Sequence, residues 1–247
     1  MNRITFSTAG SSKALDFAVT LLKSTYHFLP SSGQDATHLL LPVPSLTPDG
    51  SIIGGGDLDT LLQSVSKDVT IIGGNLNHPK LLPYKTIDLL KDPMYLAQNA
   101  KITAYCAILY ALQNLPVILA DCPVLILGFG RISKCLAKLL QQMGADVTVA
   151  ARKTEDRALS SALGYKSIEI TAVDENNYRL IDNTVPQMVL PTGNSRAIKI
   201  ELASVPGMAG ENVISARGLP GKHAPEDSGK LIAQTIRHML DRKDDSL

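Results

Sequence analysis

Short apolar runs alternate with amphipathic stretches through the first hundred residues. Apolar runs of four to eight residues bounded by turn residues are typical of buried strands, and apolar positions spaced three or four apart are typical of helices. Helices are expected from about Lys13 to Lys23 and from Asp57, as cap, to about Gln63. Strands are expected at Arg3–Phe6, Thr37–Leu41, Asp68–Ile72 and Tyr84–Leu90. This alternation predicts a parallel α/β layer.

A long apolar stretch from Pro93 to about Leu115 predicts a largely buried helix with proline in its first turn. Asn114-Leu-Pro116 ends it. Because the stretch stands between two series of strands and helices, it is interpreted as a connector between domains.

The central stretch of the chain combines a strand, a glycine turn, a helix and a second strand. The run from Pro123 ends at Gly128-Phe129-Gly130, and an amphipathic helix then extends to Gly144. Asp146–Ala151 is the second strand. Together they predict one βαβ unit of the dinucleotide-binding kind.

Further elements follow this unit. A helix is expected from Thr154, as cap, to Gly164, and another from Asp227 to about Arg242. The remaining strands are expected around Ser167–Ile170, Gln187–Leu190, Lys199–Ala203 and Val213–Ala216. The predicted fold class is α/β, with two doubly wound, Rossmann-like parallel sheets. The expected first domain is an α/β domain at 1–98 that binds the substrate or a partner, followed by a connecting helix at 99–115. A dinucleotide-binding domain is expected at 116–225, and a C-terminal helix at 226–247 is expected to pack back between the domains.

The glycine turn predicts a pyrophosphate site. Gly128 lets the chain reverse, Gly130 lets the backbone approach the ligand, and the N–H groups of the helix start hold its negative charge. Ser133 replaces the third glycine of the usual fingerprint. The candidate cofactor residues here are Gly128, Phe129, Gly130, Arg131 and Ile132. A tight turn that binds nothing is the alternative.

The end of the second strand favours NADP(H) over NAD(H). NAD sites usually place an acidic residue there for the ribose 2′-hydroxyl. This chain instead has Arg152 and Lys153, whose positive charges suit a 2′-phosphate. An ordinary charged pair before a helix is the competing interpretation.

Charge and composition narrow the class of protein and the kinds of partner that the chain could bind. With 45% hydrophobic residues, 19% charged residues and a net charge of +1, the chain suits a globular protein with a sizeable core and gives no case for nucleic acid or an anionic membrane. Cys106, Cys122 and Cys135 lack metal-site spacing and are expected to be reduced thiols, so no metal is predicted. No signal peptide or membrane span is recognised, and a cytoplasmic location is expected.

Several segments resemble the A-subunit family of dipicolinate synthase. They are Leu127–Ser133, Ala150-Ala-Arg152, Asn183-Thr-Val-Pro186, Ala203-Ser-Val-Pro-Gly207 and Gly218-Leu-Pro-Gly221 with Ala224-Pro225, and upstream Leu41–Ser45 and Asn99–Ala104. The resemblance runs essentially end to end. The nucleotide domain is also similar to those of D-2-hydroxyacid dehydrogenases and adenosylhomocysteinase. The chain departs from the family at Asn99–Cys106, where the proline, acid and glycine of a helix-start motif are changed, and in a shorter segment before Ser204.

The resemblance implies an NADP-dependent oxidation of dihydrodipicolinate to dipicolinate during sporulation, with the flavoprotein-like B-subunit of dipicolinate synthase as partner. The substrate's two carboxylates would need polar or cationic groups, for which Ser45, Thr103, Lys101, Lys222 and the helix starts at Ser11 and Thr103 are candidates. His223 is the candidate proton acceptor, because imidazole titrates near neutral pH. Thr184, Val185, Pro186 and Ser204 are further candidate cofactor residues. The substrate is expected in a cleft between the two domains, with Pro42–Ser45 and Thr103 on one side and Gly218–His223 on the other.

Two other functions stay open. A 2-hydroxyacid dehydrogenase needs an Arg–Glu–His set, for which Arg196, Glu201 and His223 are present but not in a recognisable placement. The third possibility is a non-catalytic NADP-binding subunit, which the altered Asn99–Cys106 segment favours slightly.

Overall fold

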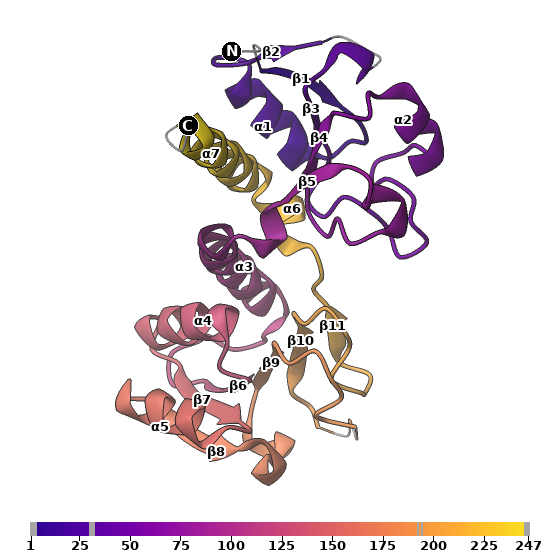
Figure 1. Cartoon of the computed structure of the whole chain (residues 1–247). Coiled ribbons are helices and arrows are strands. Elements are labelled where there is room, and N and C mark those ends of the chain that lie inside the picture. The colour runs from indigo at the N-terminus through magenta and orange to yellow at the C-terminus, as the bar shows by residue number, and fades with distance from the viewer. Residues whose placement is uncertain (1–3, 30–32, 192, 194, 245–247) are drawn as a thin grey trace. The chain divides into compact units, whose positions relative to one another are not determined.

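The computed structural model describes residues 4–29, 33–191, 193 and 195–244. The chain forms two compact units, Met1–Asn99 with Pro220–Leu247, and Ala100–Leu219. Each unit contains one parallel sheet flanked by helices (Figure 1). The α/β fold class with two Rossmann-like sheets is therefore confirmed.

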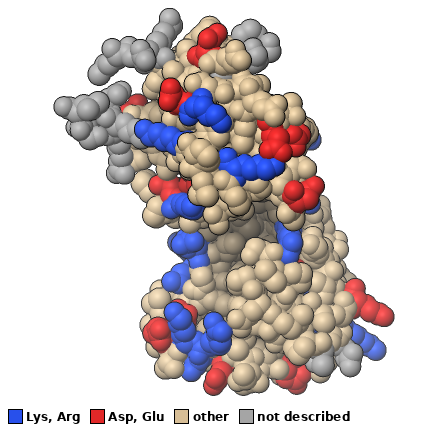
Figure 2. Space-filling model, turned by 45° about the vertical axis from the view of Figure 1, so that its right-hand side comes forward, with Lys and Arg blue, Asp and Glu red and all other residues tan. Residues whose placement is uncertain are grey.

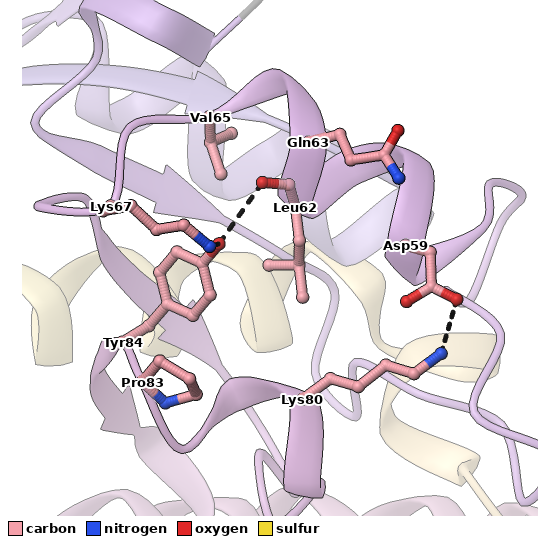
Figure 3. A pocket seen from close by; sticks show the side chains of 8 residues that line it. All are labelled: Asp59, Leu62, Gln63, Val65, Lys67, Lys80, Pro83 and Tyr84. Atoms are coloured by element: carbon pink, nitrogen blue, oxygen red, sulfur yellow. Dashed lines mark hydrogen bonds and ion pairs between the residues drawn. The ribbon is translucent and has the colours of Figure 1, made fainter.

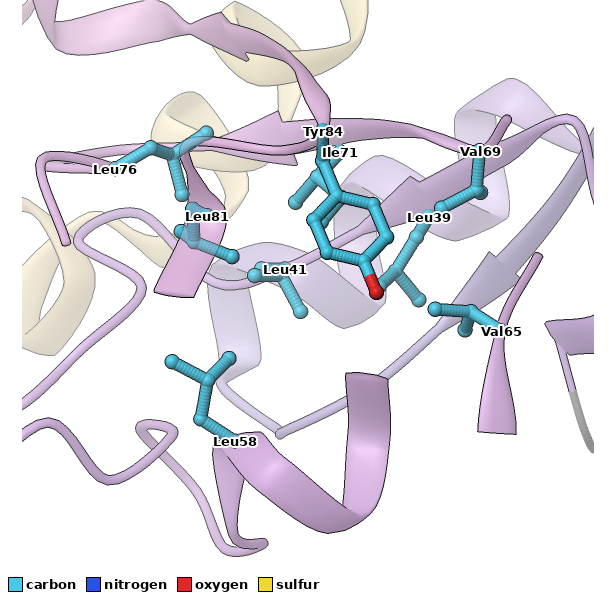
Figure 4. Close-up of a cluster of buried hydrophobic side chains, with 9 residues drawn as sticks. All are labelled: Leu39, Leu41, Leu58, Val65, Val69, Ile71, Leu76, Leu81 and Tyr84. Carbon is cyan, nitrogen blue, oxygen red and sulfur yellow. The ribbon is translucent and has the colours of Figure 1, made fainter. Parts of the chain in front are cut away.

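The first unit has a five-stranded sheet in the order β2-β1-β3-β4-β5. Its strands are β1 (Thr5–Thr8), β2 (His27–Phe28), β3 (His38–Leu40), β4 (Thr70–Gly73) and β5 (Lys85–Asp88). All adjacent pairs are parallel. One face packs into an apolar cluster that includes Leu39, Ile71 and Tyr84 (Figure 4). Burial of this cluster holds the sheet against α2 (Leu58–Ser64).

Polar caps fix where the helices of the first unit begin. The Ser12 side chain accepts a hydrogen bond from the backbone N–H of Leu15, at the start of α1 (Lys13–Leu22). Asp57 accepts one from Thr60, at 2.8 Å, at the start of α2, as the sequence predicts. Arg3, where a strand was expected to begin, lies outside the described residues.

The last helix of the chain, α7 (Pro225–Asp244), packs against α1. A Cβ atom on Gly229 would lie 2.5 Å from the Cβ of Phe17 and 2.7 Å from the carbonyl oxygen of Ala14, so only glycine permits this close approach. The Arg237 guanidinium also donates to the carbonyl of Leu21. The C-terminal helix is thus part of the first unit, and the idea that it packs between domains stays a prediction.

The second unit has a six-stranded sheet in the order β11-β10-β9-β6-β7-β8. Its strands are β6 (Pro123–Leu127), β7 (Asp146–Ala151), β8 (Lys166–Glu169), β9 (Leu180–Asn183), β10 (Ile198–Glu201) and β11 (Val213–Ser215). This is the strand order of dinucleotide-binding sheets. The crossover helices are α4 (Arg131–Gln142) and α5 (Thr154–Ala162), and α4 packs on β6 and β7. The predicted βαβ unit is present.

Three expectations about the second half are wrong. The fourth strand of this sheet is β9 at Leu180–Asn183, and 187–190 contributes only an isolated bridge from Leu190 to Met208. The cap of α5 is Lys153, which makes no side-chain hydrogen bond, and Thr154 is the first helical residue. Leu219–His223, expected as loop, is the short helix α6.

The long helix α3 spans Pro93–Asn114, close to the predicted range. Short 3-10 turns lie at Gly33–Asp35, Pro79–Leu81, Leu89–Lys91, Ile170–Ala172 and Glu175–Asn177. None of the helices in the described ranges is long and apolar enough to cross a bilayer.

Candidate cofactor-binding site

The glycine turn lies where the strand order of the second sheet reverses. β6 pairs with β7 on one side and with β9 on the other. In open parallel sheets, ligands bind outside the carboxyl ends of the two strands at such a switch point. The segments that follow β6 and β9 are Gly128–Gly130 and Thr184–Pro186. Both segments are among the candidates that the sequence indicates.

Gly128 is required by the loop that follows β9. Its φ is 90°, a conformation that other residues rarely adopt, and a Cβ atom would lie 2.8 Å from Val185 Cγ2 and 2.9 Å from Thr184 Oγ1. Its N–H donates to the carbonyl of Ala150, at 2.8 Å. The glycine therefore lets two strand-end loops touch as well as letting the chain turn.

Ser133, in place of the third glycine, links the helix to the same loop. Its side chain is fully buried, and its Oγ lies 2.7 Å from Thr184 Oγ1. The Thr184 hydroxyl donates its proton to the carbonyl of Leu127, at 2.9 Å, so Ser133 is the donor to Thr184. A small residue still fits here, and it adds a hydrogen bond that glycine could not make.

The start of α4 suits an anion. Gly130 caps the helix, no side chain bonds to the first N–H groups, and an ideal Cβ at Gly130 would meet nothing within 4 Å. A pyrophosphate therefore fits in front of these N–H groups, which carry the positive end of the helix dipole. Phe129 is buried edge-on to Tyr165, with ring centroids 6.4 Å apart, and this contact anchors the turn. Arg131 is exposed and Ile132 is half-buried at the helix start.

Arg152 follows directly after β7 and extends toward the loop after β9. Its guanidinium donates to Gln187 Oε1 at 3.2 Å, and none of the ion pairs among the described residues involves it. Its positive charge is thus not neutralised by a carboxylate. Arg157 donates to the carbonyls of Ala151 and Arg152, at 2.9 and 2.6 Å, and so fixes the backbone there. Lys153 is exposed beside it.

Comparisons with known proteins agree with this geometry. Residues 124–188 match the family model of the saccharopine dehydrogenase NADP binding domain. The A-subunit of dipicolinate synthase from Bacillus subtilis (strain 168) is 26% identical over 171 residues, which cover 63% of this chain and 58% of that relative. This chain is a distant relative of that A-subunit.

Solved structures share the fold along the whole chain. The crystal structure of the dipicolinate synthase A chain from Bacillus subtilis has a TM-score of 0.84 at 18% identity, covering 100% of this chain and 99% of that one. A transhydrogenase from Sinorhizobium meliloti has a TM-score of 0.70 at 11% identity, covering 97% and 94%. The apo-structure of D-lactate dehydrogenase from Escherichia coli has a TM-score of 0.61 at 12% identity, covering 98% of each chain. The match of residues 124–188 to an NADP binding domain identifies NADP(H) as the cofactor of the second unit.

A buried polar network at the ends of β9 and β10 was not expected from the sequence. Glu201 is 2% exposed and accepts hydrogen bonds from Asn183 and from the backbone of Ala203 and Gly207. Arg196, which the 2-hydroxyacid dehydrogenase alternative would also need, is exposed. Ser204, a candidate cofactor residue, is exposed on the loop that Glu201 holds.

A second buried charge lies on the same strand, β10. Lys199, whose side chain is 1% exposed, forms an ion pair of 2.5 Å with Glu175 and donates to the carbonyl of Ala209. Ser195 donates to the same Glu175 carboxylate. These contacts join β10 to the segments that carry Glu175 and Ala209, so their role is structural.

In the first unit, two candidate substrate residues have structural partners. Ser45 is completely buried, its hydroxyl donates to the carbonyl of Pro42 at 2.7 Å and accepts from the N–H of Gly74 at 2.9 Å. The Ser11 hydroxyl donates to the carbonyl of Gly54 at 3.1 Å. Both bonds fix loops at the carboxyl ends of the first sheet. Direct contact of either residue with substrate stays a prediction.

The remaining candidates lie on helices. Thr103 is buried in the interior of α3, which begins ten residues earlier at Pro93, so the expected benefit from a helix start at Thr103 is wrong. Lys101 is exposed on the same helix, and Lys222 and His223 are exposed on α6. The substrate cleft that would combine them stays a prediction.

The first unit also has an open pocket that the sequence did not indicate. It measures about 480 Å³ and lies between α2 and the turn at Pro79–Leu81 (Figure 3). Lys80 pairs there with Asp59 at 2.5 Å, and Lys67 donates to the Tyr84 hydroxyl at 3.2 Å. Both lysines already have partners, so the pocket carries no assigned ligand.

Surface charge and metal-ligand residues add no further site. On the face in Figure 2, Lys and Arg side chains lie near Asp and Glu side chains. In the described part of the chain, no group of three or more His, Cys, Asp or Glu could bind a metal. Cys106 and Cys122 are buried, and Cys135 is partly buried.

Proposed function

We propose that this chain oxidises dihydrodipicolinate to dipicolinate with NADP⁺, as an enzyme like the dipicolinate synthase A-subunit, with a role in sporulation. The NADP⁺ part of this proposal is supported by the switch point of the second sheet. The Gly128 turn lies there, with the start of α4, which has no side-chain cap, and with Arg152, which no carboxylate neutralises among the described residues. The substrate half is supported by the similarity to the dipicolinate synthase A-subunit.

The reaction places few chemical demands on the protein. When bound, NADP⁺ would supply the hydride acceptor for a ring carbon of the substrate, which also loses one proton and becomes aromatic. The chain has to orient the ring and bind two carboxylates. We propose Lys222 and Lys101 as carboxylate partners, because both cationic groups are exposed, and His223 as the proton acceptor. Ser45 and Thr103 would act by shaping the site.

We also propose that this chain works with a second, different subunit, since the relative is named as one subunit of a synthase. The expected class is the flavoprotein-like B-subunit. In that arrangement this chain supplies the NADP(H) site, and the partner contributes to substrate supply or turnover.

The test is a turnover assay with the purified chain, alone and with a B-subunit partner, using dihydrodipicolinate and either NADP⁺ or NAD⁺. NADPH formation that depends on dihydrodipicolinate supports the proposal. NADPH binding without turnover, even with the partner present, identifies a non-catalytic subunit instead. Oxidation of D-2-hydroxy acids in place of dihydrodipicolinate contradicts the proposal.

A further inference from the structure

Glu201 brings together three segments of the second unit. Its Oε1 accepts from Asn183 Nδ2 at 2.8 Å and from the N–H of Ala203 at 3.1 Å, and its Oε2 accepts from the N–H of Gly207 at 2.7 Å. The side chain is buried at the end of β10. One carboxylate therefore satisfies donors from the loop after its own strand and from the end of the neighbouring strand.

No cation balances this buried carboxylate. None of the ion pairs among the described residues includes Glu201. A buried carboxylate without a cationic partner depends on N–H donors that point at it. All three donors here do so, and an amide in its place would turn an N–H₂ group toward at least one of them.

The bonds continue from Glu201 to the glycine turn. Asn183 Oδ1 accepts from the N–H of Val185 at 2.9 Å, and its Nδ2 also donates to the Val185 carbonyl at 3.0 Å. The next residue, Thr184, is bonded to Leu127 and Ser133 beside the turn. A continuous set of hydrogen bonds thus joins the ends of β6, β9 and β10.

Packing at Gly207 keeps the two loops in contact. A Cβ atom there would lie 2.4 Å from Asn183 Nδ2 and 2.5 Å from the carbonyl oxygen of Gln187. The loop after β10 therefore lies directly against the loop after β9. We call these segments, residues 183–186 and 203–207, the paired loops.

We propose that Glu201 is a positioning residue for NADP(H). It holds the paired loops as one rigid edge along which the cofactor extends from the glycine turn, without touching the cofactor itself. Preorganised loops bind more tightly because less ordering is left to occur on binding. The inference rests on the NADP(H)-binding part of the proposed function and is independent of the substrate oxidised.

The test compares Glu201→Gln with Glu175→Gln. Both changes neutralise a carboxylate in the same unit, but Glu175 is only partly buried and pairs with Lys199 away from the glycine turn. NADPH binding is measured by titration of the cofactor's own fluorescence, which is simplified because the chain has no tryptophan. We expect Glu201→Gln to weaken NADPH binding at least about tenfold, the scale of a hydrogen bond to a charged group, and Glu175→Gln by less than about twofold.

The melting temperatures of both variants show whether a loss of NADPH affinity results from lost positioning of the loops or from a general loss of stability. Equal losses of NADPH affinity in the two variants, or a folded Glu201→Gln protein with unchanged affinity, would overturn the inference. If Glu201→Gln does not fold, Asn183→Ala removes the bond from β9 to Glu201 together with both Asn183–Val185 bonds, and leaves both backbone bonds of Glu201 in place. It should weaken NADPH binding in the same direction, and an unchanged affinity would again overturn the inference.

Hydrogen exchange gives a readout that needs no ligand. The amides of Ala203 and Gly207 should exchange faster in Glu201→Gln than in wild type, and at the wild-type rate in Glu175→Gln. Unchanged exchange of both amides in Glu201→Gln contradicts the positioning role. Wild-type protein that binds NADPH but does not oxidise dihydrodipicolinate would refute the proposed reaction and leave this inference standing.

Discussion

Replacing Asp182 by asparagine should stabilise the second unit, and more so as the pH rises. Asp182 lies on β9 between Ile126 and Ile200 and is 1% exposed. Neither carboxyl oxygen has a hydrogen-bond partner among the residues that the structure describes. Burial raises the pKa of this carboxyl from 3.8 to about 8. Between these two pKa values the folded chain holds a proton that the unfolded chain has released.

The sign and size of the effect follow from proton linkage. A raised pKa in the folded state means that the contribution of Asp182 to stability is fully present below about pH 4. It is lost as the pH rises through the folded-state pKa of about 8. The loss is about 1.4 kcal/mol per pH unit, which makes roughly 4 kcal/mol by pH 7. Asparagine has nearly the same shape and does not ionise, so this loss should be absent from the variant.

Urea unfolding followed by circular dichroism, at intervals from about pH 5 to pH 8, measures the difference between variant and wild type. We expect the stability advantage of Asp182→Asn to grow with pH. Asp146→Asn is the control, because Asp146 is a surface residue on β7 paired with Lys166 and should change stability by less than about 1 kcal/mol. A difference between Asp182→Asn and wild type that is constant across this range would refute the reasoning.

Three further predictions concern the cofactor and substrate. Arg152→Ala should lose about 1–3 kcal/mol of NADPH binding and little NADH binding in calorimetric titrations, since a charge-assisted phosphate contact is removed; tighter binding of NAD(H) than of NADP(H) by wild type would contradict this. Gly128→Ala should lower the melting temperature, because the new methyl group would lie 2.8 Å from Val185 Cγ2, whereas Gly130→Ala should melt like wild type yet bind NADPH more weakly, since its methyl group enters the open space before α4; equal melting of both would show that the loop contact at Gly128 is unimportant. Single alanine variants at the four candidate substrate residues should each reduce turnover while the NADPH affinity stays near wild type. Full activity in all four variants would contradict the proposed substrate site. The four residues are Ser45, Thr103, Lys222 and His223.

The sequence predicted the central βαβ unit well because its signals are local. The apolar run of β6 is bounded by Pro123 and Gly128, and β7 covers the predicted Asp146–Ala151. All the residues on which that prediction depends lie within one continuous stretch, 123–151. The same locality gave the Asp57 cap and the long helix from Pro93.

The strand β9 was missed because two of its four residues are polar yet buried. Asp182 and Asn183 made the segment look like a loop, while burial and bonding depend on partners far along the chain. The bonds of Glu201 could not be predicted for the same reason. Its position within the predicted strand at Lys199–Ala203 was the one local indication. Ser45 was proposed as a substrate residue because it is polar and follows a strand, and its bonds to Pro42 and Gly74 could not be predicted because Gly74 lies 29 residues away along the chain.

The packing of α7 on α1 has a consequence for the order in which the chain folds. The second unit is continuous in sequence from Ala100 to Leu219, whereas the first needs residues from both sides of it. During synthesis, the NADP(H)-binding unit is complete before α7 emerges, and α1 waits with an uncovered face for a helix more than two hundred residues later. The first unit is therefore synthesised first but completes its folding last. A truncation or destabilising substitution in α7 should leave a folded second unit attached to an incompletely folded first unit.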